Sequence, residues 1–174
     1  AWGYPLDPQA MDDALVVTKK LGLSSKSRER DRRPTLPELD LLMAHFGRIR
    51  THRPRSTPMQ QITAFAIFST RRQEEIIRIA WTDFEPVAPP SHPDARILIR
   101  DMKHPGDKQG NDVFCDLPLE ATAIIEAMPR KAKEIFPYSV DAVSAAFTRA
   151  CKLLGIDDLH FHDLRHEATS RLFE

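Results

Sequence analysis

Apolar residues recur at the three- and four-residue spacing of helices along most of this chain. Helices are predicted at residues 10–21, 35–47, 58–69, 72–80, 119–128, 140–154 and from 163 onward. Thr35 and Glu38 form a capping box, and Thr57 and Ser139 are favourable caps for two later helices. Gly47 and Gly155 are typical helix ends. The buried stripe of the second helix is predicted to be Leu36, Leu39, Leu42, Met43 and Phe46.

The pattern changes in the middle of the chain. Residues 95–102 and 112–117 favour β-strands, and the segment between them is rich in Pro, Gly, Asp and Asn, as in a long hairpin turn. We therefore expect an α+β fold, mostly helical, with a small antiparallel β-hairpin.

Residues 24–33 contain no apolar residue, which predicts an exposed linker. Residues 1–33 are accordingly interpreted as an inter-domain linker with a remnant of an upstream region. Residues 34–174 are expected to form one domain, for which the length is sufficient.

Composition is ordinary for a soluble globular protein, with 41% hydrophobic and 29% charged residues. No run is long enough for a membrane span, and no signal peptide opens the chain. Cys115 and Cys151 fall in different predicted elements, so no disulfide framework is expected and a cytoplasmic location is the default.

Charge is unevenly distributed although the formal net charge is zero. Residues 19–55 contain eleven Lys and Arg against four Asp and Glu. Such a segment favours contact with a phosphate backbone, and a solvated linker is the alternative. The candidate DNA-binding residues in it are Arg48, Arg50, Arg53 and Arg55.

Three separated segments each place a cation beside the end of a predicted element. Arg72 opens a helix with Glu75 three residues on, where the carboxylate can hold the guanidinium. Lys103 heads the hairpin turn, and His162 and Arg165 share a helix face. A guanidinium offers a rigid fork of donors for phosphate, and an imidazole exchanges protons near neutral pH.

Alternatives exist for these positions. Arg71 competes with Arg72, and Lys108 competes with Lys103 as the hairpin lysine. An ordinary surface ion pair would also explain an Arg beside Glu75. His166 either supports Arg165 or only packs against it.

Taken in order, these segments resemble the tyrosine recombinases of the phage-integrase family. The resemblance rests on Arg72, Glu75, Ile79, Trp81 and Asp83, on Lys103, and on His162-Asp-Leu-Arg165-His166, and it covers residues 34–174. It implies the catalytic domain of a site-specific recombinase that cleaves and rejoins DNA through a 3′-phosphotyrosyl intermediate.

The resemblance also implies roles for single residues. Arg72 and Arg165 would bind the scissile phosphate, Lys103 would protonate the leaving oxygen, and His162 would move a proton at the nucleophile. Glu75 and His166 would support them. No cofactor is implied. A metal site is not expected either, because the spacing of Cys151, His162 and His166 fits no common zinc signature.

The pattern departs from the family at the nucleophile. The family's tyrosine follows the His-x-x-Arg helix, whereas this chain has only Tyr4 and Tyr138. We therefore expect a domain cut before its tyrosine, inactive alone and monomeric, from a parent that acts as a tetramer on double-stranded DNA. The competing hypothesis is a non-catalytic DNA-binding or regulatory module that uses residues 19–55.

Overall fold

The computed structural model describes residues 8–21, 31–87, 93–102 and 110–171, and the chain divides into two compact units, residues 1–30 and 31–174. The first unit contains α1 (Pro8–Lys20), close to the helix predicted from the sequence. Several apolar side chains of α1 are half exposed or more, namely Met11, Leu15, Val16 and Val17, and so is Leu21 just after the helix.

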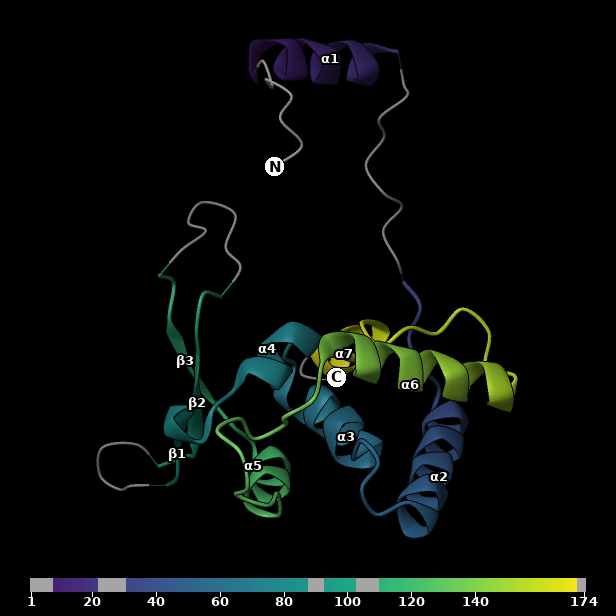
Figure 1. The fold of residues 1–174 in the computed structure, drawn as a ribbon, viewed down its shortest axis with the longest axis vertical. Helices are drawn as coiled ribbons and strands as arrows, with labels where there is room; N and C mark the ends of the chain where they lie inside the picture. Colours follow the sequence, from purple (N-terminus) through teal and green to yellow (C-terminus); the bar gives the residue numbers. More distant parts are fainter. Residues whose placement is uncertain (1–7, 22–30, 88–92, 103–109, 172–174) are drawn as a thin grey trace. The chain divides into compact units, whose positions relative to one another are not determined.

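The second unit is mostly helical with a small antiparallel sheet, as predicted. In chain order it contains α2 (Leu36–His52), α3 (Met59–Ser69), α4 (Gln73–Arg78), the short 3₁₀ helix η1 (Trp81–Asp83), β1 (Phe84–Glu85), β2 (Arg96–Ile99), β3 (Val113–Asp116), α5 (Leu119–Glu126), α6 (Val140–Leu154) and α7 (Asp163–Arg171). Figure 1 shows this arrangement.

Helix α3 is the centre around which the other helices of this unit pack. It contacts α2, α4, α5, α6 and α7 (Figure 1). Its Ile62, Phe65 and Ala66, predicted to share one face, are buried. Phe65 meets Phe136 at a centroid distance of 5.3 Å. Burying a side chain of this size stabilises the fold by roughly 1.5–3 kcal/mol. Packing against α3 therefore holds the neighbouring helices in place, and these helices carry charged residues.

The sheet has the order β1-β2-β3, with both pairings antiparallel. Strand β2 lies within the strand predicted at residues 95–102, and its Ile97 and Ile99 are buried in the core, two residues apart on one face. Strand β1, which the sequence pattern did not reveal, pairs Phe84 with Ile97. The predicted hairpin is therefore the larger part of a three-stranded sheet.

Helix α2 differs from its prediction at two positions of its buried stripe and at its C-terminus. Leu36 is 64% exposed and Met43 is half-buried, so only Leu39, Leu42 and Phe46 form the buried face. Gly47 does not end the helix, which continues to His52. A Cβ on Gly47 would lie 2.8 Å from Gln60 Nε2, so this glycine leaves room for the Gln60 side chain of α3.

Helix caps follow the sequence in most places. Thr35 and Glu38 form the capping box of α2, and the Ser139 side chain accepts a hydrogen bond from the backbone N–H of Ala142. Gly155 ends α6 with a positive φ of 68°. The prediction for Thr57 is wrong, because Pro58 occupies the N-cap position of α3 without a side-chain cap.

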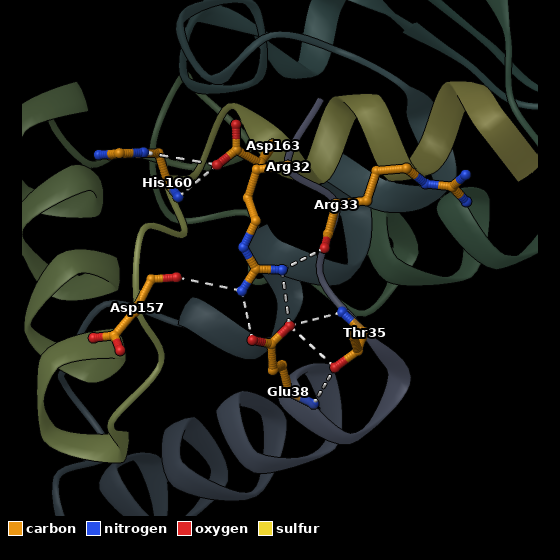
Figure 2. A network of polar contacts seen from close by, with 7 residues as sticks. All are labelled: Arg32, Arg33, Thr35, Glu38, Asp157, His160 and Asp163. Carbon is orange, nitrogen blue, oxygen red and sulfur yellow. Dashed lines mark hydrogen bonds and ion pairs between the residues drawn. The ribbon is translucent and has the colours of Figure 1, made fainter. Parts of the chain in front are cut away.

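The compact second unit begins at Asp31, within the segment predicted to be an exposed linker. Arg32 forms an ion pair with Glu38, and Arg33 forms one with Glu167 on α7. Figure 2 shows Arg32 between α2 and the segment that precedes α7. The last residues of the predicted linker are thus fastened to the unit that follows.

Candidate functional site

Arg72 precedes α4 and lies against Glu75, one turn further along. Glu75 Oε2 accepts the backbone N–H of Arg72 at 3.0 Å, and Oε1 accepts Arg72 Nη1 at 2.8 Å. The Glu75 side chain is 10% exposed and that of Arg72 is 36% exposed. One carboxylate therefore caps the first turn of α4 and holds the guanidinium in place.

Arg165, on α7, reaches the same carboxylate from a distant part of the sequence. Its Nη1 lies 3.9 Å from Glu75 Oε2. This nitrogen is buried and has no hydrogen-bond partner among the described residues. Burial lowers the pKa of Arg165 first, and the positive charge of Arg72 lowers it further. The protein thus holds a partly desolvated cation with one unsatisfied donor, a costly state that an anion nearby would relieve.

The balance of charge at this point favours an anion. Two guanidinium groups share one carboxylate, and Arg71 adds to the positive potential at Arg165. A phosphate at the accessible part of the Arg165 side chain, 29% of which is exposed, could screen the repulsion between Arg72 and Arg165. The arrangement can therefore bind and orient an oxyanion.

His162 and His166 adjoin this cluster. His162 lies in the turn before α7, and the two rings meet edge to face at a centroid distance of 5.3 Å. Although His162 is an exposed residue, partial enclosure of its ring lowers its pKa, and His166, Arg165 and Arg72 lower it further. The imidazole is therefore neutral at pH 7 and able to accept a proton.

Arg71 is engaged elsewhere, which bears on the choice between Arg71 and Arg72. Its Nε donates to the Ser69 carbonyl at 2.9 Å, and its Nη2 donates to Thr70 Oγ1 at 2.9 Å. Its Nη1 lies 3.2 Å from Cys115 Sγ on β3. The pairing with Glu75 belongs to Arg72, whereas Arg71 ties the end of α3 to the sheet.

Lys103 and its competitor Lys108 both lie outside the described residues. The structure does describe the base of the hairpin that contains them. Arg100 Nε and Nη2 donate to Asp83 Oδ1 at 3.1 and 2.6 Å, and the Asp83 side chain is 3% exposed. This pair joins the end of β2 to the helical side of the unit.

The four candidate DNA-binding arginines form a separate group. Arg48 and Arg50 lie in the last turns of α2, and Arg53 and Arg55 follow its end. Arg50 Nη1 donates to the Ser56 carbonyl. Within the described ranges, no contact joins this group to the cluster of Arg72, Glu75 and Arg165.

Of the two tyrosines, only Tyr138 is among the described residues, and it is not placed at the cluster. Tyr4 lies outside the described residues, and Tyr138 is half-buried against the hydrophobic core before α6. Sequence reasoning also passed over Arg33 and Glu167, whose ion pair contacts the helix that carries Arg165. They are 134 positions apart, and no local pattern connects them.

Comparisons with known proteins agree on the class. No family model matches the chain. Over 149 residues it is 32% identical to the shufflon-specific DNA recombinase of Escherichia coli, a match that covers 85% of this chain and 34% of that protein. The chain thus spans about a third of the length of this curated relative.

Solved structures share the fold. The lambda integrase catalytic core matches with a TM-score of 0.59 at 17% identity, over 82% of each chain. A lambda integrase tetramer bound to a Holliday junction matches with a TM-score of 0.62 at 18% identity, over 95% of this chain and 51% of the other. The recombinase relative and the shared integrase fold agree, and the chain belongs to the tyrosine recombinase family.

The helices of the described ranges are all too short or too polar to cross a bilayer.

Proposed function

We propose that this chain supplies the phosphate-binding part of a site-specific DNA recombinase. In this proposal Arg72 and Arg165 hold the phosphate at which a DNA strand is cut and rejoined. The observation that carries it is the sharing of the Glu75 carboxylate by both arginines, with a buried donor of Arg165 left over. Glu75 positions Arg72 and takes no part in the chemistry.

The reaction proposed for the whole protein is phosphoryl transfer. A tyrosine oxygen attacks the phosphorus, the bond to the 5′-oxygen breaks, and a 3′-phosphotyrosyl link forms. Negative charge on the non-bridging oxygens is stabilised by Arg72 and Arg165. His162, neutral at pH 7, accepts the proton of the nucleophile, and Lys103 donates one to the leaving oxygen. His166 supports His162 through their ring contact.

The nucleophile is not assigned to a residue of this chain. Tyr138 packs against the core, and no described contact brings it to Arg72 or Arg165. We therefore propose that the chain alone binds a DNA phosphate without cleaving the strand. A suicide DNA substrate, which traps the covalent adduct, tests this: no adduct is expected, and an adduct on Tyr138 would overturn the assignment.

Residues 1–33 are proposed to be a linker and the remnant of an upstream region, followed by a partial catalytic domain at 34–174. The lambda catalytic core matches 82% of this chain, a share close to that of residues 31–174, whereas the longer lambda integrase chain matches 95%. This difference supports an upstream origin for the first unit.

The partner proposed for the chain is double-stranded DNA in the cytoplasm. The parent protein would act as a tetramer on DNA, which is the form of lambda integrase in its structure with a Holliday junction. This chain by itself would be a monomer. Binding should weaken steeply with added salt, because contacts with phosphate release counterions.

The experiment that tests the proposal compares Arg165→Ala with the wild-type chain in binding to short duplex DNA at several salt concentrations. We expect weaker binding and a smaller salt dependence, since one phosphate contact is lost. Arg149→Ala is the control, because Arg149 is an exposed arginine on α6. Equal effects of the two substitutions would contradict a special role for Arg165.

A further inference from the structure

Glu167 lies on α7 beside the residues of the phosphate site, and its carboxylate is almost fully buried. Arg33 Nε donates to Glu167 Oε2 at 2.9 Å, and the two side chains are 39% and 9% exposed, respectively. A charge-assisted hydrogen bond to a buried carboxylate is stronger than one between exposed groups. The Arg33–Glu167 pair therefore restrains α7.

The restraint acts at a particular angle around the helix axis. Leu164 and Ala168 are buried and form the stripe of α7 that faces the protein interior. Arg165 and Glu167 flank this stripe on opposite sides, about 160° apart at 3.6 residues per turn. The ion pair that holds Glu167 thus sets the rotation of α7 about its buried stripe. A change in this rotation moves Arg165, which lies on the other flank.

Arg165 depends on such a restraint because its own bonds do little to fix it. Its Nη1 has no hydrogen bond among the described residues, and its ion pair with Glu75 spans 3.9 Å. The position of the guanidinium therefore follows the position of α7.

The backbone of Arg33 is itself held in place by contacts that do not involve α7. Pro34 follows it and is buried, and a following proline restricts the backbone of Arg33 to extended conformations. Arg32 donates to the Arg33 carbonyl and to both carboxylate oxygens of Glu38. In Figure 2 the Arg33 side chain points away from Glu38, so the two arginines bind on different sides of the segment.

The same network reaches the segment that leads into α7. Arg32 Nη2 donates to the Asp157 carbonyl at 3.3 Å, and Asp163, the first residue of α7, accepts the backbone N–H of His160 at 2.8 Å (Figure 2). Residues 31–35 therefore connect the start of α2 with both the approach to α7 and its buried flank.

We propose that Arg33 is a positioning residue for the phosphate site, acting through Glu167 to hold α7 at the rotation that aims Arg165 at the anion. This inference rests on the proposed function, because it assumes that Arg72 and Arg165 share an oxyanion. It adds that the end of the upstream linker controls the affinity of the site, although no residue of the linker touches the anion.

The experiment titrates the folded chain with inorganic sulfate, following affinity by calorimetry and the Arg165 Nε–H resonance by NMR. Arg33→Gln is expected to weaken sulfate binding about three- to tenfold and to shift that resonance in the free protein. Arg33→Lys keeps the charge and should recover part of the affinity. The exchanged pair Arg33→Glu with Glu167→Arg should recover part of it too.

Arg96→Gln is the matched control. Arg96 Nε donates to Glu85 Oε2 at 2.7 Å on the sheet, with side chains 30% and 38% exposed, and this pair does not involve α7. It should leave both sulfate affinity and the Arg165 resonance unchanged. Where Arg33→Gln does not fold, Glu167→Gln removes the same ion pair and takes its place in the comparison.

The outcomes separate the two proposals. Wild-type affinity in a folded Arg33→Gln chain would overturn the positioning role and leave the proposed function intact. A wild-type chain that binds no sulfate at Arg165 would overturn the proposed function, and the positioning role with it.

Discussion

Arg165 Nη1 lies 3.9 Å from Glu75 Oε2, close enough for an ion pair and too far for a hydrogen bond. Arg72, by contrast, donates to the other oxygen of Glu75 at 2.8 Å. Glu75 thus binds one arginine fully and the second only electrostatically. The carboxylate keeps two cations together and leaves the buried Arg165 Nη1 without a hydrogen bond.

Glu75→Gln should make the free protein less stable and make its stability depend on anions. Without the carboxylate charge, Arg72 and Arg165 repel each other in a partly buried site, at a cost of about 1–2 kcal/mol in the free energy of unfolding. Sulfate should restore much of this loss by taking the place of the carboxylate charge. Urea denaturation in low-salt buffer, with and without sulfate, measures both effects.

Glu74→Gln is the control for that measurement. Glu74 pairs with Arg78, and both side chains are more than 60% exposed. Loss of this pair should change stability by under about 0.5 kcal/mol, with no specific response to sulfate. Equal behaviour of the two variants would show that the Glu75 charge does not offset the repulsion between Arg72 and Arg165 in solution.

The charge state of His162 should be coupled to anion binding. Its pKa lies below 6.5 in the free protein because of burial and the cations around it. A bound oxyanion favours the protonated ring, so sulfate should raise the His162 pKa and bind more tightly as pH falls through it. Titration of the imidazole resonances with and without sulfate measures the shift; a pKa unchanged by saturating sulfate would place the anion elsewhere.

Folding stability should respond to His162 in the opposite sense. Its pKa is lower in the folded than in the unfolded chain, so the unfolded state binds more protons between the two values. Wild-type stability relative to His162→Gln should therefore be greatest above about pH 6.5 and decline as pH falls through that region. Urea midpoints of both chains across this pH range give the comparison.

Glu38→Gln isolates the charge that holds the linker end. Hydrogen bonds from Arg32 lower the pKa of Glu38 from 4.5 to about 2, and Gln preserves the capping-box geometry with Thr35. The substitution should cost about 1–2 kcal/mol at pH 7. A carboxyl group whose pKa is lowered by folding stabilises the fold at pH values above its pKa in the unfolded chain. The difference in stability between the wild-type chain and Glu38→Gln should therefore shrink below pH 4.5 and vanish near pH 2.

Urea unfolding of the wild-type chain and Glu38→Gln over that pH range checks the prediction. Asp40→Asn, an exposed change on the same helix, controls for the general loss of an acid. A difference that persists undiminished near pH 2 would mean that the Arg32–Glu38 ion pair does not account for the effect.

The arginines at the end of α2 should contribute to DNA affinity without deciding where the phosphate docks. Joint substitution of Arg48, Arg50, Arg53 and Arg55 by Gln should weaken duplex binding and reduce its salt dependence, because we expect each arginine to make a non-specific contact with the phosphate backbone. Sulfate binding at Arg165 should be unchanged. If this variant lost DNA binding completely while Arg165→Ala lost none, the result would favour a module that binds DNA through residues 19–55.

Local chemistry explains what could be predicted from the sequence. The ends of α6 follow from the Ser139 cap and from Gly155, because both act on their own helix. The Arg72–Glu75 pair likewise follows from a spacing of three at a helix start. The approach of Arg165 to the Arg72–Glu75 pair is different, since no local pattern links α4 to α7: only the family resemblance anticipated that Arg165 and Arg72 would act together, and the contact with Glu75 was not predicted.

The differences arise where a distant element decides the outcome. Gly47 was expected to end α2, but the space it leaves is used by Gln60 of α3, whose Nε2 donates to the Met43 carbonyl at 2.9 Å. Strand β1 has two residues and exists through its pairing with β2. The Arg33–Glu167 pair joins two segments that only the folded chain brings together.

The most direct test of the central claim is a crystal structure of this chain with tungstate, a tetrahedral phosphate mimic located by its anomalous scattering. The account predicts an oxyanion within hydrogen-bonding distance, about 2.7–3.2 Å, of the guanidinium groups of both Arg72 and Arg165. Tungstate bound at other positions only, with Arg72 and Arg165 bare at saturating concentration, would contradict it.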